Sequence, residues 1–91
     1  MVGIVAVITK LMPDSPEADL GKIEKSAKEM LEKEGAKNIS FEREPIAYGL
    51  SSIKIKFAWP EEKNSDIIDN SLAKIKHVSS VQIEDYRRAF G

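Results

Sequence analysis

Residues 52–60 read SIKIKFAWP, which is the clearest alternation of apolar and polar side chains in the chain. Successive side chains of a β-strand point to opposite faces of its sheet, so this alternation predicts a strand with one buried face. The residues predicted to face the core are Ile53, Ile55, Phe57 and Trp59. Those predicted to face away from it are Ser52, Lys54 and Lys56. Pro60 is expected to end the strand, because proline cannot donate to a hydrogen-bond ladder.

The segment before this strand predicts its hairpin partner. Three residues alternate with polar neighbours, as in a half-exposed strand: Ile39, Phe41 and Arg43. Pro45 after them favours an edge position, because an edge strand tolerates a missing backbone donor. Tyr48 and Gly49 are expected to form the turn into the strand at 52–59.

The N-terminal third predicts a strand followed by a helix. Residues 2–12 are apolar on both alternating faces, which is typical of a central strand. The sequence PDSP at 13–16 is expected to end it, and Asp19 is the predicted helix N-cap. The apolar stripe of this helix is Leu20, Ile23, Ala27, Met30 and Leu31. Gly35 stands where a helix C-terminal cap belongs.

The C-terminal third repeats the helix and strand pattern. Asn64 or Ser65 can cap a second helix. Its apolar stripe is Ile68, Leu72 and Ile75, with Ile67 alongside. A last strand is predicted from about Ser80 to Arg87, with Val81 and Ile83 facing inward. The order β-α-β-β-α-β predicts an α+β, ferredoxin-like sandwich, in which a four-stranded antiparallel sheet carries two helices on one face.

Composition restricts the possible functions. The 91 residues carry 14 Lys and Arg against 15 Asp and Glu, a net charge of −1, which argues against a protein that mainly binds nucleic acid phosphates. The absence of cysteine excludes disulfides and Cys-ligated zinc. No apolar run approaches the roughly 18 residues of a membrane span. We expect one soluble, cytoplasmic domain over residues 1–91.

The residues that bear reactive groups form no recognisable catalytic set. The loop at 13–16 has no Arg or Gly and holds an acid, so it does not suit the phosphate cradle of an acylphosphatase. His77 is the single histidine, and without a predicted partner we interpret it as structural or solvated. Four acids could together ligate a metal through oxygen, although solvated sheet-face charges are the favoured interpretation: Glu42, Glu44, Glu84 and Asp85. We expect no enzyme activity, cofactor or metal.

Other functions known for this fold remain open. An RNA-binding module would need aromatic side chains on the uncovered sheet face, whereas Phe57 and Trp59 lie on the predicted core side. RNA binding is therefore disfavoured. A ligand-sensing module or a scaffold that dimerises through its sheet edges is a further alternative.

The segment between the second and third predicted strands reads EPIAYGL at 44–50 and resembles the central signature of elongation factor 1-beta exchange domains. The sequence VQIED at 81–85 is similar to the Val-Gln-x-x-Asp pattern near the C-terminus of that family. The opening residues 5–8 and 12–16, with Asp85-x-Arg87-Arg88 near the end, resemble the archaeal branch.

The resemblance implies a guanine nucleotide exchange factor for elongation factor 1-alpha, the GTPase that carries aminoacyl-tRNA, in its GDP-bound and nucleotide-free forms. It implies no direct contact with nucleic acid or membrane. The implied partner contacts are Pro45, Ile46, Ala47, Tyr48 and Gly49 in the turn, and Asp85, Arg87, Arg88 and Phe90 near the end. We expect these two groups to form one contiguous surface.

One family residue does not carry over to this chain. Eukaryotic relatives place a near-terminal lysine and the signature aromatic against the GTPase, where the lysine disturbs the Mg²⁺ site. Tyr48 takes the place of the aromatic, but the position of the lysine falls on Gly91. Arg87 and Arg88 are the nearest cations, and Phe90 is either a partner contact or a lid on the core.

Overall fold

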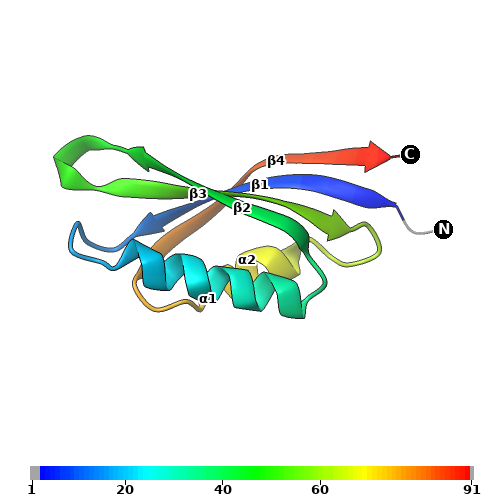
Figure 1. Ribbon diagram of the computed structural model, residues 1–91, viewed down its shortest axis with the longest axis horizontal. Helices are drawn as coiled ribbons and strands as arrows, with labels where there is room; N and C mark the ends of the chain where they lie inside the picture. The colour runs from blue at the N-terminus through cyan, green and yellow to red at the C-terminus, as the bar shows by residue number, and fades with distance from the viewer. Residues whose placement is uncertain (1–2, 91) are drawn as a thin grey trace.

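The computed structural model describes the backbone of residues 3–90 and their side chains other than those of Tyr48, Arg88, Ala89 and Phe90. In chain order the elements are β1 (Ile4–Pro13), α1 (Leu20–Lys33), β2 (Lys37–Pro45), the 3-10 helix η1 (Ala47–Gly49), β3 (Ser51–Pro60), α2 (Asp66–Ala73) and β4 (Val78–Phe90). The four strands form one antiparallel sheet in the order β2-β3-β1-β4, and both helices lie on the same face (Figure 1). The predicted ferredoxin-like sandwich is confirmed, and among residues 3–90 no helix lies over its second sheet face.

The strand quoted first builds the core as predicted. Ile53, Ile55, Phe57 and Trp59 of β3 are all buried, together with residues of β1, α1 and α2. The rings of Phe57 and Trp59 meet edge to face, with their centroids 6.1 Å apart. The indole N–H of Trp59 donates to the carbonyl oxygen of Lys63 at 3.3 Å, so its polar atom is satisfied.

Both predicted caps of α1 are confirmed. The carboxylate of Asp19 accepts from the backbone N–H of Lys22 at 3.2 Å. At the other end Gly35 has a φ of +99°, a left-handed conformation that glycine adopts without strain. Its N–H donates to the carbonyl oxygen of Glu32 at 3.0 Å, which satisfies a carbonyl in the last turn. The fully buried side of the helix is Ile23, Ala27 and Leu31.

β1 is the central strand, as predicted, and its two faces have different neighbours. The core-facing side chains are Val5, Val7, Thr9 and Leu11, all buried. The alternate residues Ile4, Ala6 and Ile8 face the uncovered side and are exposed or half-buried. Pro13 closes β1 opposite Val78, so the strand runs one residue further than predicted. Val2, also predicted in this strand, lies outside the described residues.

The last strand is longer than predicted. β4 begins at Val78 rather than Ser80 and extends to Phe90 rather than Arg87. Its 13 residues pair with the 10 residues of β1, because three register shifts each add one residue to β4. The extra residues are Ser79, Glu84 and Ala89. Each bulge interrupts the alternation of side chains, which is why pattern alone placed the ends too far inward.

The second helix is shorter than its apolar pattern indicates. α2 ends at Ala73, so the buried Ile75 lies beyond it. The side-chain oxygen of Asn64 accepts from the N–H of Asp66 at 2.9 Å, whereas Ser65 makes no side-chain cap. Within residues 3–90, no helix is long and apolar enough to cross a membrane.

Ser52 contradicts its predicted exposure. It is only 1% exposed, although it belongs to the polar set of β3. Ser52 lies directly opposite Glu44, whose carboxylate makes a 2.9 Å ion pair with Lys54. We attribute the burial to these two long side chains, which flank a short one on the same face.

Candidate partner-binding site

The first group of predicted contacts forms the connection between β2 and β3. Pro45 ends β2 on an edge strand, as its missing N–H predicted. The N–H of Ile46 donates to the carbonyl oxygen of Leu50 at 2.7 Å, which closes the connection. Ile46 is 40% exposed, and Ala47 is exposed. The side chain of Tyr48 lies outside the described residues.

Gly49 gives the connection its shape. Its φ of +75° lies in the left-handed region, which explains why glycine is needed there. A β-carbon at this position would stand 3.9 Å from Cβ of Pro16, so the backbone angle rather than crowding is the constraint. The same contact places the η1 turn beside the loop between β1 and α1.

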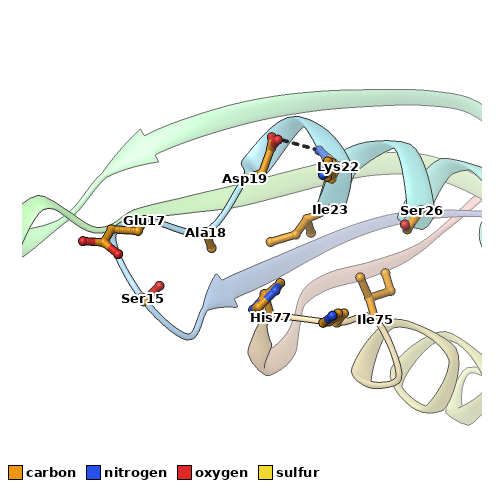
Figure 2. Close-up of a pocket in the computed structure, with 10 residues that line it drawn as sticks. Ser15, Glu17, Ala18, Asp19, Lys22, Ile23, Ser26, Ile75 and His77 are labelled. Carbon is orange, nitrogen blue, oxygen red and sulfur yellow. Dashed lines mark hydrogen bonds between the residues drawn. The ribbon is translucent and has the colours of Figure 1, made fainter.

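That loop forms one wall of a hollow of about 580 Å³ (Figure 2). The other walls come from the first turns of α1 and from the segment before β4. At the rim, Nδ1 of His77 lies 3.4 Å from Oδ2 of Asp14, and the backbone N–H of Asp14 donates to the carbonyl oxygen of His77 at 2.9 Å. The sequence left His77 without a partner, and the structure supplies Asp14. Because both side chains are about half exposed, the pair joins two chain segments and does not form a buried acid–base site.

The second group of predicted contacts lies toward the end of β4. Asp85 is opposite Ile8, and Arg87 is opposite Ala6, so both belong to the uncovered face of the sheet. Nε of Arg87 lies 3.0 Å from Oδ1 of Asp85. The side chain of Arg87 is 79% exposed and that of Asp85 is 34% exposed. The arginine is thus held at one nitrogen while most of its side chain meets solvent.

The remaining members of this group are placed by their backbones alone. Arg88 pairs with Val5, and Phe90 pairs with Ile4. Their side chains, like Gly91 at the family's lysine position, lie outside the described residues.

An apolar patch lies beside Asp85 and Arg87. It consists of Ile4, Ala6, Ile8 and Ala58. Ile4 is 40% exposed, and a shallow hollow of about 410 Å³ lies over the patch. Sequence reasoning misses this patch because apolar residues on both alternating faces are typical of any central strand. The predicted topology is the signal that could reveal the patch, because two helices on one face of the sheet leave the alternate residues of β1 uncovered.

The two groups of predicted contacts do not form one contiguous surface, so that prediction is wrong. β3 starts beside η1 and ends opposite the beginning of β1, where Ile4 pairs with Pro60. The end of β4 also pairs with Ile4. Since the molecule is 45 Å long, the η1 turn and the end of β4 lie at opposite ends of the sheet (Figure 1).

Ion pairs occupy the uncovered face between the two ends. Lys54 lies 2.9 Å from Glu44 and 3.9 Å from Glu84, and Lys56 lies 3.9 Å from Glu42. The hydrogen bond and charge of Lys54 lower the pKa of Glu44, and Glu44 raises the pKa of Lys54. The acids considered as metal ligands are thus each matched to a cation, and no three such groups converge on a metal-binding point within the described residues.

Residues 6–89 match the model of the EF-1 guanine nucleotide exchange domain. The chain belongs to this family. Its members exchange guanine nucleotide on a GTPase of translation elongation, so the chain is an exchange factor and its partner is an elongation GTPase. The matched residues include the 45–49 turn, Asp85, Arg87 and Arg88, and they end one residue before Phe90.

Proteins named elongation factor 1-beta from several archaea are similar over nearly the whole chain. That of Methanocaldococcus jannaschii is 37% identical over 83 residues, which cover 90% of this chain and 92% of the relative. That of Haloarcula marismortui is 34% identical over 88 residues, covering 96% and 99%. That of Methanothermobacter thermautotrophicus is 32% identical over 88 residues, covering 96% and 98%. The family match therefore spans the first predicted contact group and most of the second.

Proposed function

We propose that residues 1–91 act as a single exchange domain that speeds GDP release from elongation factor 1-alpha and so lets GTP reload it in the cytoplasm. The observation that carries this proposal is the family match over residues 6–89, which includes the η1 turn and most of the end of β4. The domain contacts the GDP-bound and nucleotide-free forms of the GTPase without making or breaking a covalent bond. Nucleic acid and membrane take no part.

Nucleotide exchange depends on how strongly the factor binds each form of the GTPase. Mg²⁺ and the phosphate-binding loop of a GTPase hold GDP tightly, so release is slow without help. A factor that binds the empty GTPase better than the GDP-bound form weakens GDP by the same factor, because coupling between two ligands is reciprocal. A preference of about 4 kcal/mol weakens GDP roughly a thousandfold.

The separation of the two contact groups gives a physical route to this preference. The η1 turn and the end of β4 belong to one four-stranded sheet with a continuous core, so their separation is fixed. A GTPase conformation that contacts both the η1 turn and the end of β4 is stabilised by two contacts. A conformation in which one of the two contacting surfaces of the GTPase is displaced is stabilised by only one. Exchange is driven by the difference in binding free energy between these two conformations.

The direct test is release of fluorescent GDP from purified elongation factor 1-alpha, chased with excess unlabelled nucleotide. Substoichiometric amounts of this protein are expected to speed release over many turnovers. A release rate that stays at the spontaneous value at every concentration of the protein would overturn the proposal.

A variant locates the activity in the η1 turn. Tyr48→Ala is expected to raise the half-saturating concentration about thirtyfold, as loss of an aromatic anchor at an interface does. Tyr86→Ala is the matched control, because Tyr86 is the second of the two tyrosines, is 43% exposed and lies opposite the core-facing Val7. Circular dichroism should show both variants folded, and equal loss of folding and exchange in Tyr48→Ala would place Tyr48 in the core instead.

A further inference from the structure

The apolar patch has the properties of an interface centre. Ile4, Ala6 and Ile8 of β1 share the uncovered face with Ala58 of β3, since Ala6 pairs directly with Ala58. Neither helix covers this face (Figure 1). The small side chains of Ala6 and Ala58, with Ile4 and Ile8 on either side of Ala6 along β1, leave a shallow hollow that can accept an apolar side chain of a partner. Partner-binding surfaces commonly combine such an apolar centre with polar groups around it.

Arg87 supplies the polar group next to the patch. It lies opposite Ala6, so its side chain belongs to the face that carries the patch. Asp85 accepts from its Nε at 3.0 Å, which leaves the two terminal nitrogens of the guanidinium without a hydrogen-bond partner among the described residues. These two nitrogens form a planar fork that suits a carboxylate. Because Asp85 already holds the guanidinium at Nε, less side-chain freedom is lost when the fork is engaged.

Two other cations on this face, Lys54 and Lys56, are less available. Lys54 and Lys56 already have carboxylate partners on β2 and β4. Arg87 therefore lies at the boundary between the ion pairs and the apolar patch. A partner that buries the patch would bring its own carboxylate within reach of the Arg87 fork.

We propose that the apolar patch and Arg87 form a docking face for an apolar surface of the elongation GTPase that presents a carboxylate, with Asp85 as the positioning residue for Arg87. This inference rests on the proposed function and names the chemistry of its second contact, at the end of the sheet opposite η1. Charge complementarity favours this occupant over a second copy of the chain. Among the described residues, the acids of the uncovered face are each paired with a cation already: Glu42, Glu44, Glu84 and Asp85. A second copy that docked through the same face would therefore bring no unengaged carboxylate of that face to the fork.

RNA fits the face less well. Bases bind single-stranded RNA modules by stacking on exposed aromatic side chains. The described side chains of the patch include no aromatic ring, and Phe57 and Trp59 are buried on the other side of the sheet.

The test is a titration of the nucleotide-free GTPase with labelled wild-type protein and four variants, paired with GDP-release assays. Arg87→Ala is expected to weaken binding tenfold to a hundredfold, the effect of losing a hydrogen bond to a charged group. Asp85→Asn is expected to weaken it about threefold, because the fork remains but loses its support. Ile4→Ser is expected to weaken it about tenfold. Tyr86→Ser is the matched control, because Tyr86 is 43% exposed at the same end of the sheet but lies on the opposite face.

A double variant tests whether Asp85 acts only by positioning Arg87 or contacts the partner itself. If Asp85 acts through Arg87, Asp85→Asn has no further effect on binding in the Arg87→Ala background. A full additional loss in the double variant would overturn the positioning role. Urea unfolding of each variant shows whether a loss of binding affinity comes only from lower stability of the fold.

Failure of this inference and failure of the proposed function give different results. Wild-type protein that binds the GTPase without speeding GDP release refutes the proposed function, while the binding titration still tests the face. Wild-type exchange with unchanged binding of Arg87→Ala and Ile4→Ser refutes the docking face. Self-association in light scattering that Ile4→Ser abolishes would assign the face to a second copy. Salt-dependent RNA binding that Arg87→Ala abolishes would assign it to RNA.

Discussion

Thr9 lies in the middle of β1 with its side chain fully buried, and its hydroxyl has no hydrogen-bond partner in the part of the chain that the structure describes. Its neighbours in the sheet on the same face are Ile55 and Ile83, which offer only apolar side chains. A buried hydroxyl that has lost its water and gained no partner costs about 1–3 kcal/mol. Thr9→Val replaces that hydroxyl by a methyl group of similar size, and burial of a methyl group contributes about 0.8 kcal/mol.

With the low end of the hydroxyl cost added to the methyl contribution, we expect Thr9→Val to raise the free energy of unfolding by about 2 kcal/mol. For a domain of this size the melting temperature should rise by about 8–16 °C. Urea unfolding followed by the fluorescence of Trp59, the single tryptophan, measures the change directly. Exchange activity should not change, because Thr9 faces the helices and not the uncovered side of the sheet.

Thr9→Ser is the matched control. It keeps the hydroxyl and removes the methyl group, so it should be less stable than wild type. Stability of Thr9→Val at or below the wild-type value would show that the hydroxyl does not cost stability and would refute the reasoning.

Three further changes test the elements that hold the contact groups in place. Asp19→Ala should lower the free energy of unfolding by about 1 kcal/mol, because the first turn of α1 loses its cap, as thermal unfolding would show. Gly49→Ala should cost about 1–2 kcal/mol because its φ of +75° strains any β-carbon, and GDP release should slow with it. The pKa of Glu44 lies below its ordinary value of 4.5 because of Lys54, so its contribution to stability is present above that value and is lost as the pH falls through the lowered pKa. Lys54→Met should flatten this acid limb when urea unfolding is repeated at pH values below 4.5, and an unchanged limb would contradict the pairing.

Much of the fold could be predicted because periodicity reports directly on burial. The core-facing residues of β3 and the caps Asp19 and Gly35 of α1 each follow from one physical cause, and the structure confirms them. The limits of β4 could not be read in this way, because the bulges at Ser79, Glu84 and Ala89 shift the pattern.

The candidate site was less accessible from sequence. The resemblance of EPIAYGL and VQIED identifies the two contact groups but does not indicate how far apart they lie. Their separation follows from the sheet topology, because in this strand order the end of β4 lies beside the start of β1, away from the β2–β3 connection. The apolar patch escaped notice because periodicity cannot distinguish the covered face of a central strand from the uncovered one.

The irregular pairing of β4 also affects the tendency of the protein to aggregate at high concentration. β4 is a 13-residue strand at the edge of the sheet, and a long, regular edge is a template for aggregation. Three bulges break its outer row of backbone donors and acceptors, so a second chain cannot continue the ladder in register. The irregularities that set Asp85 and Arg87 against Ile8 and Ala6 thus also protect the strand from edge-to-edge association.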